Sequence, residues 1–188
     1  LKIKYQNTIK VIHLEQNMGQ QKALVMGLKQ ASGNYAITID DDLQHDIQAV
    51  ENMIKKSSEG SDLVFGIYQV YGDRISRALG SKLLGLVFKL QFRVLKGNRV
   101  SSYRLIHKHI YQQLSCSLDD FVYLSAELLK YAHRVSNVNV TRRNRVFGHS
   151  GYTLGKCIHI GLSLIYHYGI KPKFSRKVEE KYETHSHG

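Results

Sequence analysis

Three consecutive aspartates, Asp40, Asp41 and Asp42, directly follow a short apolar segment, 35–39. A continuous apolar segment of this length indicates a parallel strand buried on both faces. Open α/β sheets bind ligands at the carboxyl ends of such strands. Because like charges repel when packed together, either the pKa values of these carboxyl groups rise or a cation offsets their charge. Alternation along an extended chain puts Asp40, Asp42 and Gln44 on one side. Carboxylate and amide oxygens are hard ligands, so these three side chains form a candidate site for Mg²⁺ or Mn²⁺.

An aspartate after a strand can also cap the helix that follows, and Asp42 or Asp46 could do so in this chain. Capping explains one aspartate but not three in a row, so we favour the metal site. Two histidines lie beside motifs, His45 here and His149 further along, and we interpret both as lining the site at most, with ordinary polar residues as the simpler interpretation.

Strands and helices alternate through the first third of the chain. The apolar spacing predicts strands at 10–14, 35–39 and 62–66 and helices at 19–31 and 47–58. Strands separated by helices of this length imply a parallel sheet with covering helices. We therefore expect an α/β fold with a mostly parallel sheet, whose carboxyl edge positions the aspartates.

Two later segments have amphipathic or apolar character. Residues 74–96 predict a helix that is apolar around most of its circumference, with a narrow basic stripe. This pattern fits a helix lying in the membrane interface, and it equally fits a core helix whose lysines extend to water. Residues 154–169 are apolar but too short to span a bilayer, so they could lie along one or cover the core. The tail, 171–188, is polar and charged.

The chain has 188 residues, which suits one domain, and a net charge of +12. Residues 1–60 hold equal numbers of acidic and basic side chains, so the whole excess lies in residues 61–188. This asymmetry indicates an anionic partner: nucleic acid, a membrane surface or a phosphorylated substrate. Two cysteines cannot form a disulfide scaffold, and no apolar run is long enough to span a bilayer.

Five segments, in this order, resemble family 2 glycosyltransferases of the GT-A fold, and in particular their polyprenyl-phosphate branch. The segments are 17–23, 31–35, 40–45, 102–105 and 145–150. The third resembles the Asp-x-Asp-Leu-Gln motif of that branch, and the last two resemble its Arg-Leu and Arg-x-x-Gly-x-Ser segments. Any one segment alone would be weak, but their order and spacing together are specific.

The resemblance implies roles for individual residues. It assigns metal binding to Asp40, Asp42 and Gln44, donor binding to Asp40, Asp41 and Gly19, and catalysis to Asp42, Arg104 and Arg145. It also assigns binding of the donor or acceptor phosphate groups to Arg104, Arg145 and Ser150. Arginine suits the phosphate role because its planar guanidinium binds phosphate oxygens in pairs.

By the same resemblance, the expected reaction is the inverting transfer of a hexose from a UDP- or GDP-linked donor to a polyprenyl phosphate, with Mg²⁺ or Mn²⁺ as cofactor. Residues 1–73 would form the donor and metal half of a single domain, and residues 74–170 the acceptor and membrane-facing half. The family's first strand and nucleotide-binding loop would be missing from this chain. We expect a cytoplasmic protein that lies at the inner face of the cell membrane through residues 74–96 and 154–169. We expect no nucleic-acid partner, and a homo-oligomer is compatible with the sequence.

Two other functions remain open. A transferase acting on a sugar hydroxyl of a cell-envelope polysaccharide needs a general base. Asp119 and Asp120, ahead of a predicted helix at 121–132, are the acidic pair placed for it, although capping of that helix is the simpler interpretation. An inactive transferase-like domain that binds anionic surfaces would instead use the basic cluster at 142–145.

Overall fold

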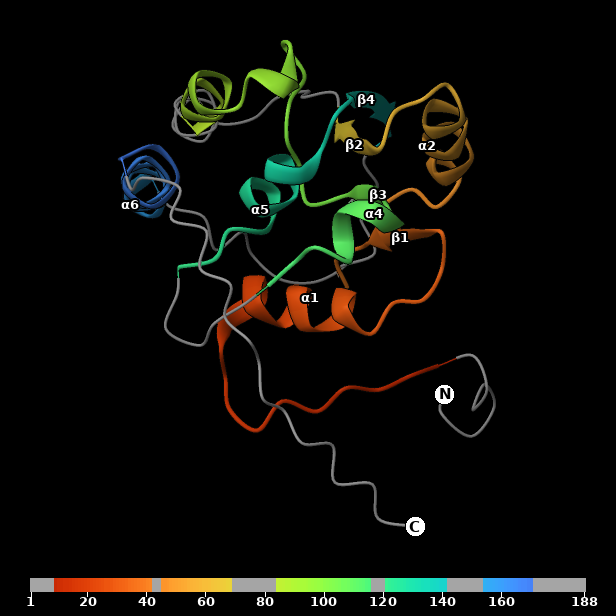
Figure 1. Ribbon diagram of the computed structural model, residues 1–188, viewed down its shortest axis with the longest axis horizontal. Coiled ribbons are helices and arrows are strands. Elements are labelled where there is room, and N and C mark those ends of the chain that lie inside the picture. Colours follow the sequence, from red (N-terminus) through yellow and green to blue (C-terminus); the bar gives the residue numbers. More distant parts are fainter. Residues whose placement is uncertain (1–8, 42–44, 69–83, 116–120, 142–153, 171–188) are drawn as a thin grey trace.

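The computed structural model of the protein describes residues 9–41, 45–68, 84–115, 121–141 and 154–170 (Figure 1). Within these residues, four strands form one sheet in the order β1-β3-β2-β4. They are β1 (Tyr35–Thr38), β2 (Leu63–Tyr68), β3 (Arg104–His107) and β4 (Val135–Val140). Strand β3 is antiparallel to β1 and β2, and β2 is parallel to β4, so β1, β2 and β4 run in one direction. The expected α/β fold is confirmed, with β3 as an antiparallel strand that the sequence patterns did not predict.

Helices cover both faces of the sheet (Figure 1). They are α1 (Gly19–Lys29), α2 (Ala49–Ser58), a helix at 84–91, α4 (Lys108–Tyr111), α5 (Leu124–Tyr131) and α6 (Leu154–Leu164), which continues as a π-helical turn, Ile165–Ile170. The predicted helices at 19–31, 47–58 and 121–132 and the predicted strands at 35–39 and 62–66 are confirmed, with ends that differ by a few residues.

Strand β2 lies at the centre of the core because both of its faces are buried. Leu63, Phe65 and Ile67 belong to the larger of two apolar clusters, to which α1, α5 and the helix at 84–91 contribute. Val64 belongs to a smaller cluster on the other face, together with Met53 of α2. Burial on both faces explains why this strand is apolar at consecutive positions.

The predicted strand at 10–14 is wrong. In the described structure these residues form no strand, and the side chains of Val11 and Ile12 are 48% and 41% exposed. Lys10 Nζ donates a hydrogen bond of 2.6 Å to Gln30 Oε1, beyond the end of α1. A strand needs a neighbour that satisfies its backbone hydrogen bonds. The described sheet offers no such neighbour at this segment, so its apolar residues remain in an irregular conformation.

The predicted helix at 74–96 ends earlier than expected, at residue 91. Residues 84–91 are helical, residues 74–83 lie outside the described residues, and a 3-10 turn follows at Arg93–Leu95. Lys96 then adopts a left-handed conformation with a φ of 44°. The turn contains Leu95, which is buried in the core, and the left-handed Lys96 followed by Gly97, with a φ of 90°, ends the helical path.

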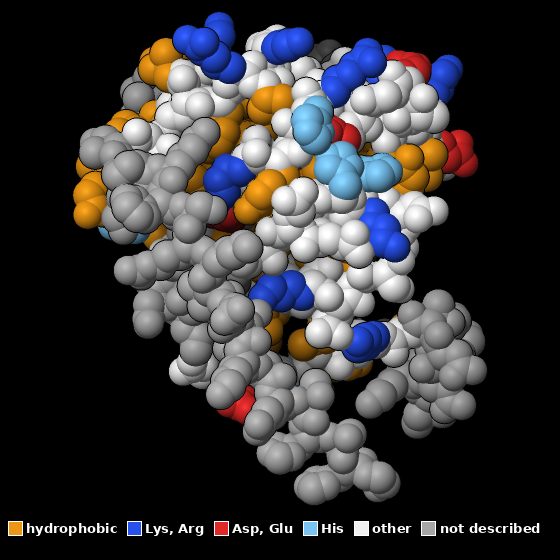
Figure 2. Space-filling view, viewed as in Figure 1, with side chains coloured by type: hydrophobic (Ala, Val, Ile, Leu, Met, Phe, Trp, Pro, Cys, Tyr) orange, Lys and Arg blue, Asp and Glu red, His pale blue; other side chains and the backbone are white. Residues whose placement is uncertain are grey.

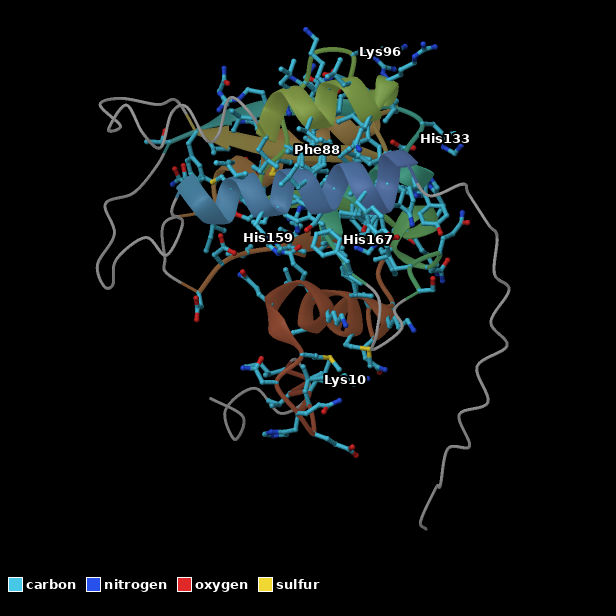
Figure 3. All side chains as sticks on the ribbon, turned by 90° about the vertical axis from the view of Figure 1, so that its left-hand side faces the viewer. Lys10, Phe88, Lys96, His133, His159 and His167 are labelled. Carbon is cyan, nitrogen blue, oxygen red and sulfur yellow. The ribbon has the colours of Figure 1, made fainter. Side chains whose placement is uncertain are left out.

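The helix at 84–91 and α6 lie side by side. Phe88 is buried between them and the sheet, as Figure 3 shows. Gln91 Nε2 donates a hydrogen bond of 3.1 Å to the backbone oxygen of Leu164. The two segments that the sequence marked as amphipathic or apolar are therefore packed together.

Candidate active site

The carboxyl end of β1 meets the beginning of β3, because the two strands are antiparallel and Thr38 pairs with Arg104. The Thr38 hydroxyl donates a hydrogen bond of 2.7 Å to the backbone oxygen of Ser102. This bond joins the segment before β3 to the end of β1. The aspartate motif that follows β1 is thereby placed against residues more than 60 positions away in the sequence.

Asp40 is the acidic residue that this arrangement fixes most firmly. Its Oδ2 accepts a hydrogen bond of 2.7 Å from the Ser102 hydroxyl and lies 3.2 Å from His45 Nε2. The hydrogen bond from His45, with smaller contributions from Ser102 and the charge of Arg104, lowers the pKa of the Asp40 carboxyl below its ordinary value of 3.8, although partial burial opposes this shift. Asp40 is therefore a carboxylate at neutral pH.

His45 contacts the aspartate motif, which agrees with the site-lining role that the sequence left open rather than with the simpler interpretation. Its side chain is buried, with ring centroids 4.5 Å from Tyr103 and 5.8 Å from Tyr68. The hydroxyl of Tyr103 donates a hydrogen bond of 2.9 Å to the backbone oxygen of Asp46. The rings of Tyr103 and Tyr68 pack against the His45 imidazole and fix its orientation toward Asp40. The clue in the sequence was only its place directly after the motif.

Tyr103 can take this position because residue 66 of the neighbouring strand β2 is a glycine. A Cβ atom at Gly66 would lie 2.7 Å from Tyr103 Cδ1 and 3.2 Å from Val140 Cγ1. Separations below 3 Å between such atoms do not occur in folded proteins. The close approach of the Tyr103 ring to the β2 backbone thus depends on the missing side chain.

Arg104 is 3% exposed, which is unusual for a charged residue. Its Nε donates a hydrogen bond of 2.9 Å to the backbone oxygen of Ser101, and its Nη1 lies 3.5 Å from Thr38 Oγ1. The guanidinium is therefore held near the end of β1, and its positive charge contributes to the lowered pKa of Asp40.

The structure joins part of the predicted site. Asp40 and Arg104 lie at one edge of the sheet, and Asp41, next to Asp40, is exposed there. Gly19 lies on a different element, at the first residue of α1, where its φ of 79° suits glycine. The remaining predicted site residues, which are Asp42, Gln44, Arg145 and Ser150, lie outside the described residues, as do His149, Asp119 and Asp120.

The helix at 84–91 and α6 each expose a row of apolar side chains. Leu86 and Leu90 on the first helix are 52% and 74% exposed. Figure 2 shows hydrophobic side chains on the side of the molecule where Figure 1 places these helices. The exposed row of the second helix consists of Ile158, Leu162, Ile165 and Tyr166. No described helix is both long and apolar enough to cross a bilayer.

Solved structures share this fold. The crystal structure of glucosyl-3-phosphoglycerate synthase from Mycobacterium tuberculosis, in complex with Mn²⁺ and UDP-glucose, superimposes with a TM-score of 0.58 over 89% of this chain and 58% of that chain. The two sequences are 16% identical, so the likeness concerns the fold. It agrees with the GT-A architecture that the motifs implied.

Sequence relatives point to one branch. The undecaprenyl-phosphate 4-deoxy-4-formamido-L-arabinose transferase of Serratia proteamaculans is 26% identical over 152 residues, which are 81% of this chain and 47% of the relative. The enzyme of the same name from Yersinia enterocolitica is also 26% identical, over 81% of this chain and 46% of its own length. The chain thus spans about half the length of these relatives.

The family profile described as Glycosyl transferase family 2 matches residues 2–115. This range is more than half of the chain and includes the aspartate motif, β1, β2 and β3. The profile, the relatives and the fold agree with one another and with the resemblance seen in the motifs. The chain belongs to glycosyl transferase family 2.

Proposed function

We propose that this chain contributes the nucleotide-sugar and metal site of an inverting glycosyltransferase that transfers a sugar to a polyprenyl phosphate at a membrane surface. The observation that carries the proposal is the ionised Asp40, held beside the buried Arg104 at the carboxyl edge of β1. The names of the two bacterial transferases support the acceptor class. They concern an arabinose derivative, whereas the mycobacterial structure holds UDP-glucose, so both pentose and hexose donors belong in the test.

A divalent ion fits the donor set on this edge. Asp40, whose carboxylate is oriented by Ser102 and His45, would hold Mg²⁺ or Mn²⁺ together with Asp42 and Gln44. When bound, such an ion stabilises the negative charge that develops on the departing nucleotide diphosphate. The lowered pKa of Asp40 keeps its carboxylate ready to bind without first losing a proton.

The arginines would bind phosphate groups of the two substrates. Arg104 supplies a fixed positive charge near the donor diphosphate, and Arg145 and Ser150 would hold the acceptor phosphate. A phosphate monoester has a second pKa near 6, so it is largely dianionic at neutral pH and needs no protein base. One of its oxygens attacks the anomeric carbon while the bond to the nucleotide diphosphate breaks. This single displacement inverts the configuration, and the protein contributes positioning and electrostatic stabilisation.

The exposed apolar rows of the helix at 84–91 and of α6 would contact the membrane that carries the lipid acceptor. Lys89, Arg93 and Lys96 are exposed on or just after the first helix. Apolar side chains flanked by cations favour the interface of an anionic leaflet. On this basis we propose a peripheral position at the inner face of the cell membrane.

The proposal is tested by measuring ligand binding and sugar transfer with the complete chain. UDP, GDP and their pentose and hexose conjugates are titrated with and without Mn²⁺, and binding is followed by the shift in melting temperature. Transfer of a labelled sugar to undecaprenyl phosphate in vesicles is measured in parallel. We expect metal-dependent binding of one nucleotide class, weakened at least about 100-fold in Asp40→Asn, because loss of a residue that only hydrogen-bonds to a metal ligand already costs about 10–100-fold.

Glu59→Gln is the matched control, since it makes the same acid-to-amide change at a solvent-exposed carboxylate paired with Lys56. It should bind like the wild type. The proposal is contradicted if no nucleotide sugar stabilises the chain, or if Asp40→Asn and Glu59→Gln behave alike. Transfer to a sugar hydroxyl, with none to the lipid phosphate, would favour the polysaccharide alternative instead.

A further inference from the structure

A second group of potential metal ligands lies at the opposite edge of the sheet, where β2 and β4 begin. Asp62 directly precedes β2, His109 is in α4, and His133 lies shortly before β4. One ligating atom from each residue lies within 4.8 Å of those of the other two. Figure 2 shows histidine side chains grouped next to an acidic side chain on this face of the molecule.

The carboxylate of Asp62 is held in place by the backbone. Its Oδ2 accepts a hydrogen bond of 2.8 Å from the N–H of His133, and its Oδ1 accepts one of 2.9 Å from the N–H of Arg134. Its side chain is only 11% exposed. The carboxylate is therefore fixed before any ligand arrives, and this preorganisation reduces the entropy lost on binding.

The hydrogen bonds of His107 determine which nitrogen of His109 carries the proton. Nδ1 of His107 accepts a hydrogen bond of 3.3 Å from the backbone N–H of His109, so this nitrogen presents a lone pair. The Nδ1 of His109 lies 2.8 Å from the same atom and must therefore be the donor. Neutral His109 consequently has no proton on Nε2.

This bare nitrogen faces a carboxylate. Nε2 of His109 is buried, has no hydrogen-bond partner among the residues that the structure describes, and lies 3.3 Å from Asp62 Oδ2. Two lone pairs at this distance repel each other, so the contact favours a cation between them, either a proton on Nε2 or a metal ion. On the other side, Nδ1 of His133 lies 3.2 Å from the same oxygen.

We propose that Asp62, His109 and His133 form a site for a transition-metal ion of the Zn²⁺ type, separate from the Mg²⁺ or Mn²⁺ site at Asp40. Two imidazoles with one carboxylate suit Zn²⁺, Co²⁺ or Ni²⁺ better than Mg²⁺, which prefers oxygen ligands. Bonds of 2.0–2.1 Å around a tetrahedral ion place neighbouring ligand atoms about 3.3 Å apart. The two nitrogen–oxygen distances of 3.3 Å and 3.2 Å match this spacing, and the two histidine nitrogens lie within 4.8 Å of each other.

The surroundings also match a metal site. A histidine that binds a metal usually donates its other ring N–H to a neighbouring acceptor, which orients the ring, and His107 provides that acceptor for His109. The side chain of His133 is 82% exposed, so an ion can enter from solvent and keep its fourth position for water. The ion would join the start of β2, α4 and the segment before β4. Because β2 has six residues, the site lies about 20 Å from the Asp40 edge.

The test uses Co²⁺ and Zn²⁺ with the complete, metal-free chain. Co²⁺ in a tetrahedral site gives intense visible absorption, and Zn²⁺ should displace it. We expect this spectrum for the wild type, and an affinity for Zn²⁺ at least about 100-fold weaker in His133→Gln, since removing a ligand costs more than removing a residue that only hydrogen-bonds to a ligand. His133 is exposed, so this variant should fold normally. His109→Gln provides a second variant with the same expected loss.

His159→Gln is the matched control, because His159 is an exposed histidine of α6, well apart from His133 in Figure 3. It should keep the spectrum and the affinity, as should Asp40→Asn at the other edge. The proposal is overturned if His133→Gln and His109→Gln bind Zn²⁺ as tightly as the wild type, which would place binding at other histidines of the chain. It is equally overturned if Co²⁺ gives no tetrahedral spectrum with the wild type.

Discussion

Each edge of the sheet places a histidine against an aspartate, but the two edges surround the pair differently. At the carboxyl edge, His45 is buried beneath Asp40 and packs against the rings of Tyr103 and Tyr68. At the amino edge, Asp62 is the buried member, and the imidazole of His133 extends into solvent.

This difference determines what each edge can bind. A buried histidine that contacts Asp40 orients the carboxylate and leaves an oxygen-rich edge, which suits a hard ion and a diphosphate. At the other edge, two imidazoles that converge on a buried carboxylate supply nitrogen ligands, and the exposed His133 leaves a path to solvent, which suits a borderline ion. The same two residue types therefore predict different chemistry, according to which of them the fold buries.

Among changes at the carboxyl edge, Arg104→Met should lower the free energy of unfolding most. The variant removes a buried charge and its bonds to Ser101 and Thr38, and hydrogen bonds to charged groups contribute about 1.5–3 kcal/mol each. We expect the free energy of unfolding, measured by urea denaturation, to fall by about 3 kcal/mol. Arg99→Met, at an exposed position, should change it by less than about 0.5 kcal/mol. Equal losses in both variants would show that burial of Arg104 is not what distinguishes this edge.

The next largest effect on stability should come from Gly66, against which the Tyr103 ring that contacts His45 is packed. In Gly66→Ala, the new Cβ would contact the Tyr103 ring at 2.7 Å, and overpacking of this kind destabilises by about 1–3 kcal/mol. Gly27→Ala is the matched control, because a Cβ there meets no atom within 4 Å and α1 gains a better helix former. We therefore expect urea denaturation to show changes of opposite sign. Stabilisation by both substitutions would mean that Tyr103 has room to move.

A smaller effect should follow from His45→Gln. If His45 positions Asp40 as the contacts indicate, metal-dependent binding of the nucleotide sugar should weaken about tenfold, the lower end of the range for residues that orient a metal ligand. His13→Gln, at an exposed position in the irregular segment before α1, should leave this affinity unchanged. If His45→Gln binds the nucleotide sugar like the wild type, His45 contributes to packing but does not position Asp40.

The smallest effect should be the pH dependence of stability that Asp40 contributes. The pKa of Asp40 is lowered in the folded state, so the unfolded chain binds its proton more readily. Its stabilisation is then fully present above the unfolded pKa of about 4 and is lost as the pH falls through the lower folded pKa. The difference in free energy of unfolding between wild type and Asp40→Asn should therefore shrink below about pH 4, as measured by urea titration at several pH values. A difference that does not vary with pH would contradict the lowered pKa.

Much of the carboxyl edge could be predicted from local sequence. The apolar run before Asp40 predicted β1, and the spacing of apolar residues predicted α1, α2 and β2, since each pattern lies within one element. The contribution of Ser102 could not be predicted, because it depends on the pairing of Thr38 with Arg104, which lie 66 positions apart. The same pairing brings Arg104 to Asp40, a position that the sequence suggested only by resemblance.

The sequence by itself determined the family, the order of the early strands and helices, and the aspartate motif at the end of β1, because these depend on short-range patterns of residue type. Only the tertiary structure decided that residues 10–14 are not a strand, since a strand requires a neighbour. It also brought Asp62, 71 positions before His133, into contact with two imidazoles. Patterns along the chain record which residues tend to be buried, whereas contacts between distant residues depend on how the sheet and its helices pack.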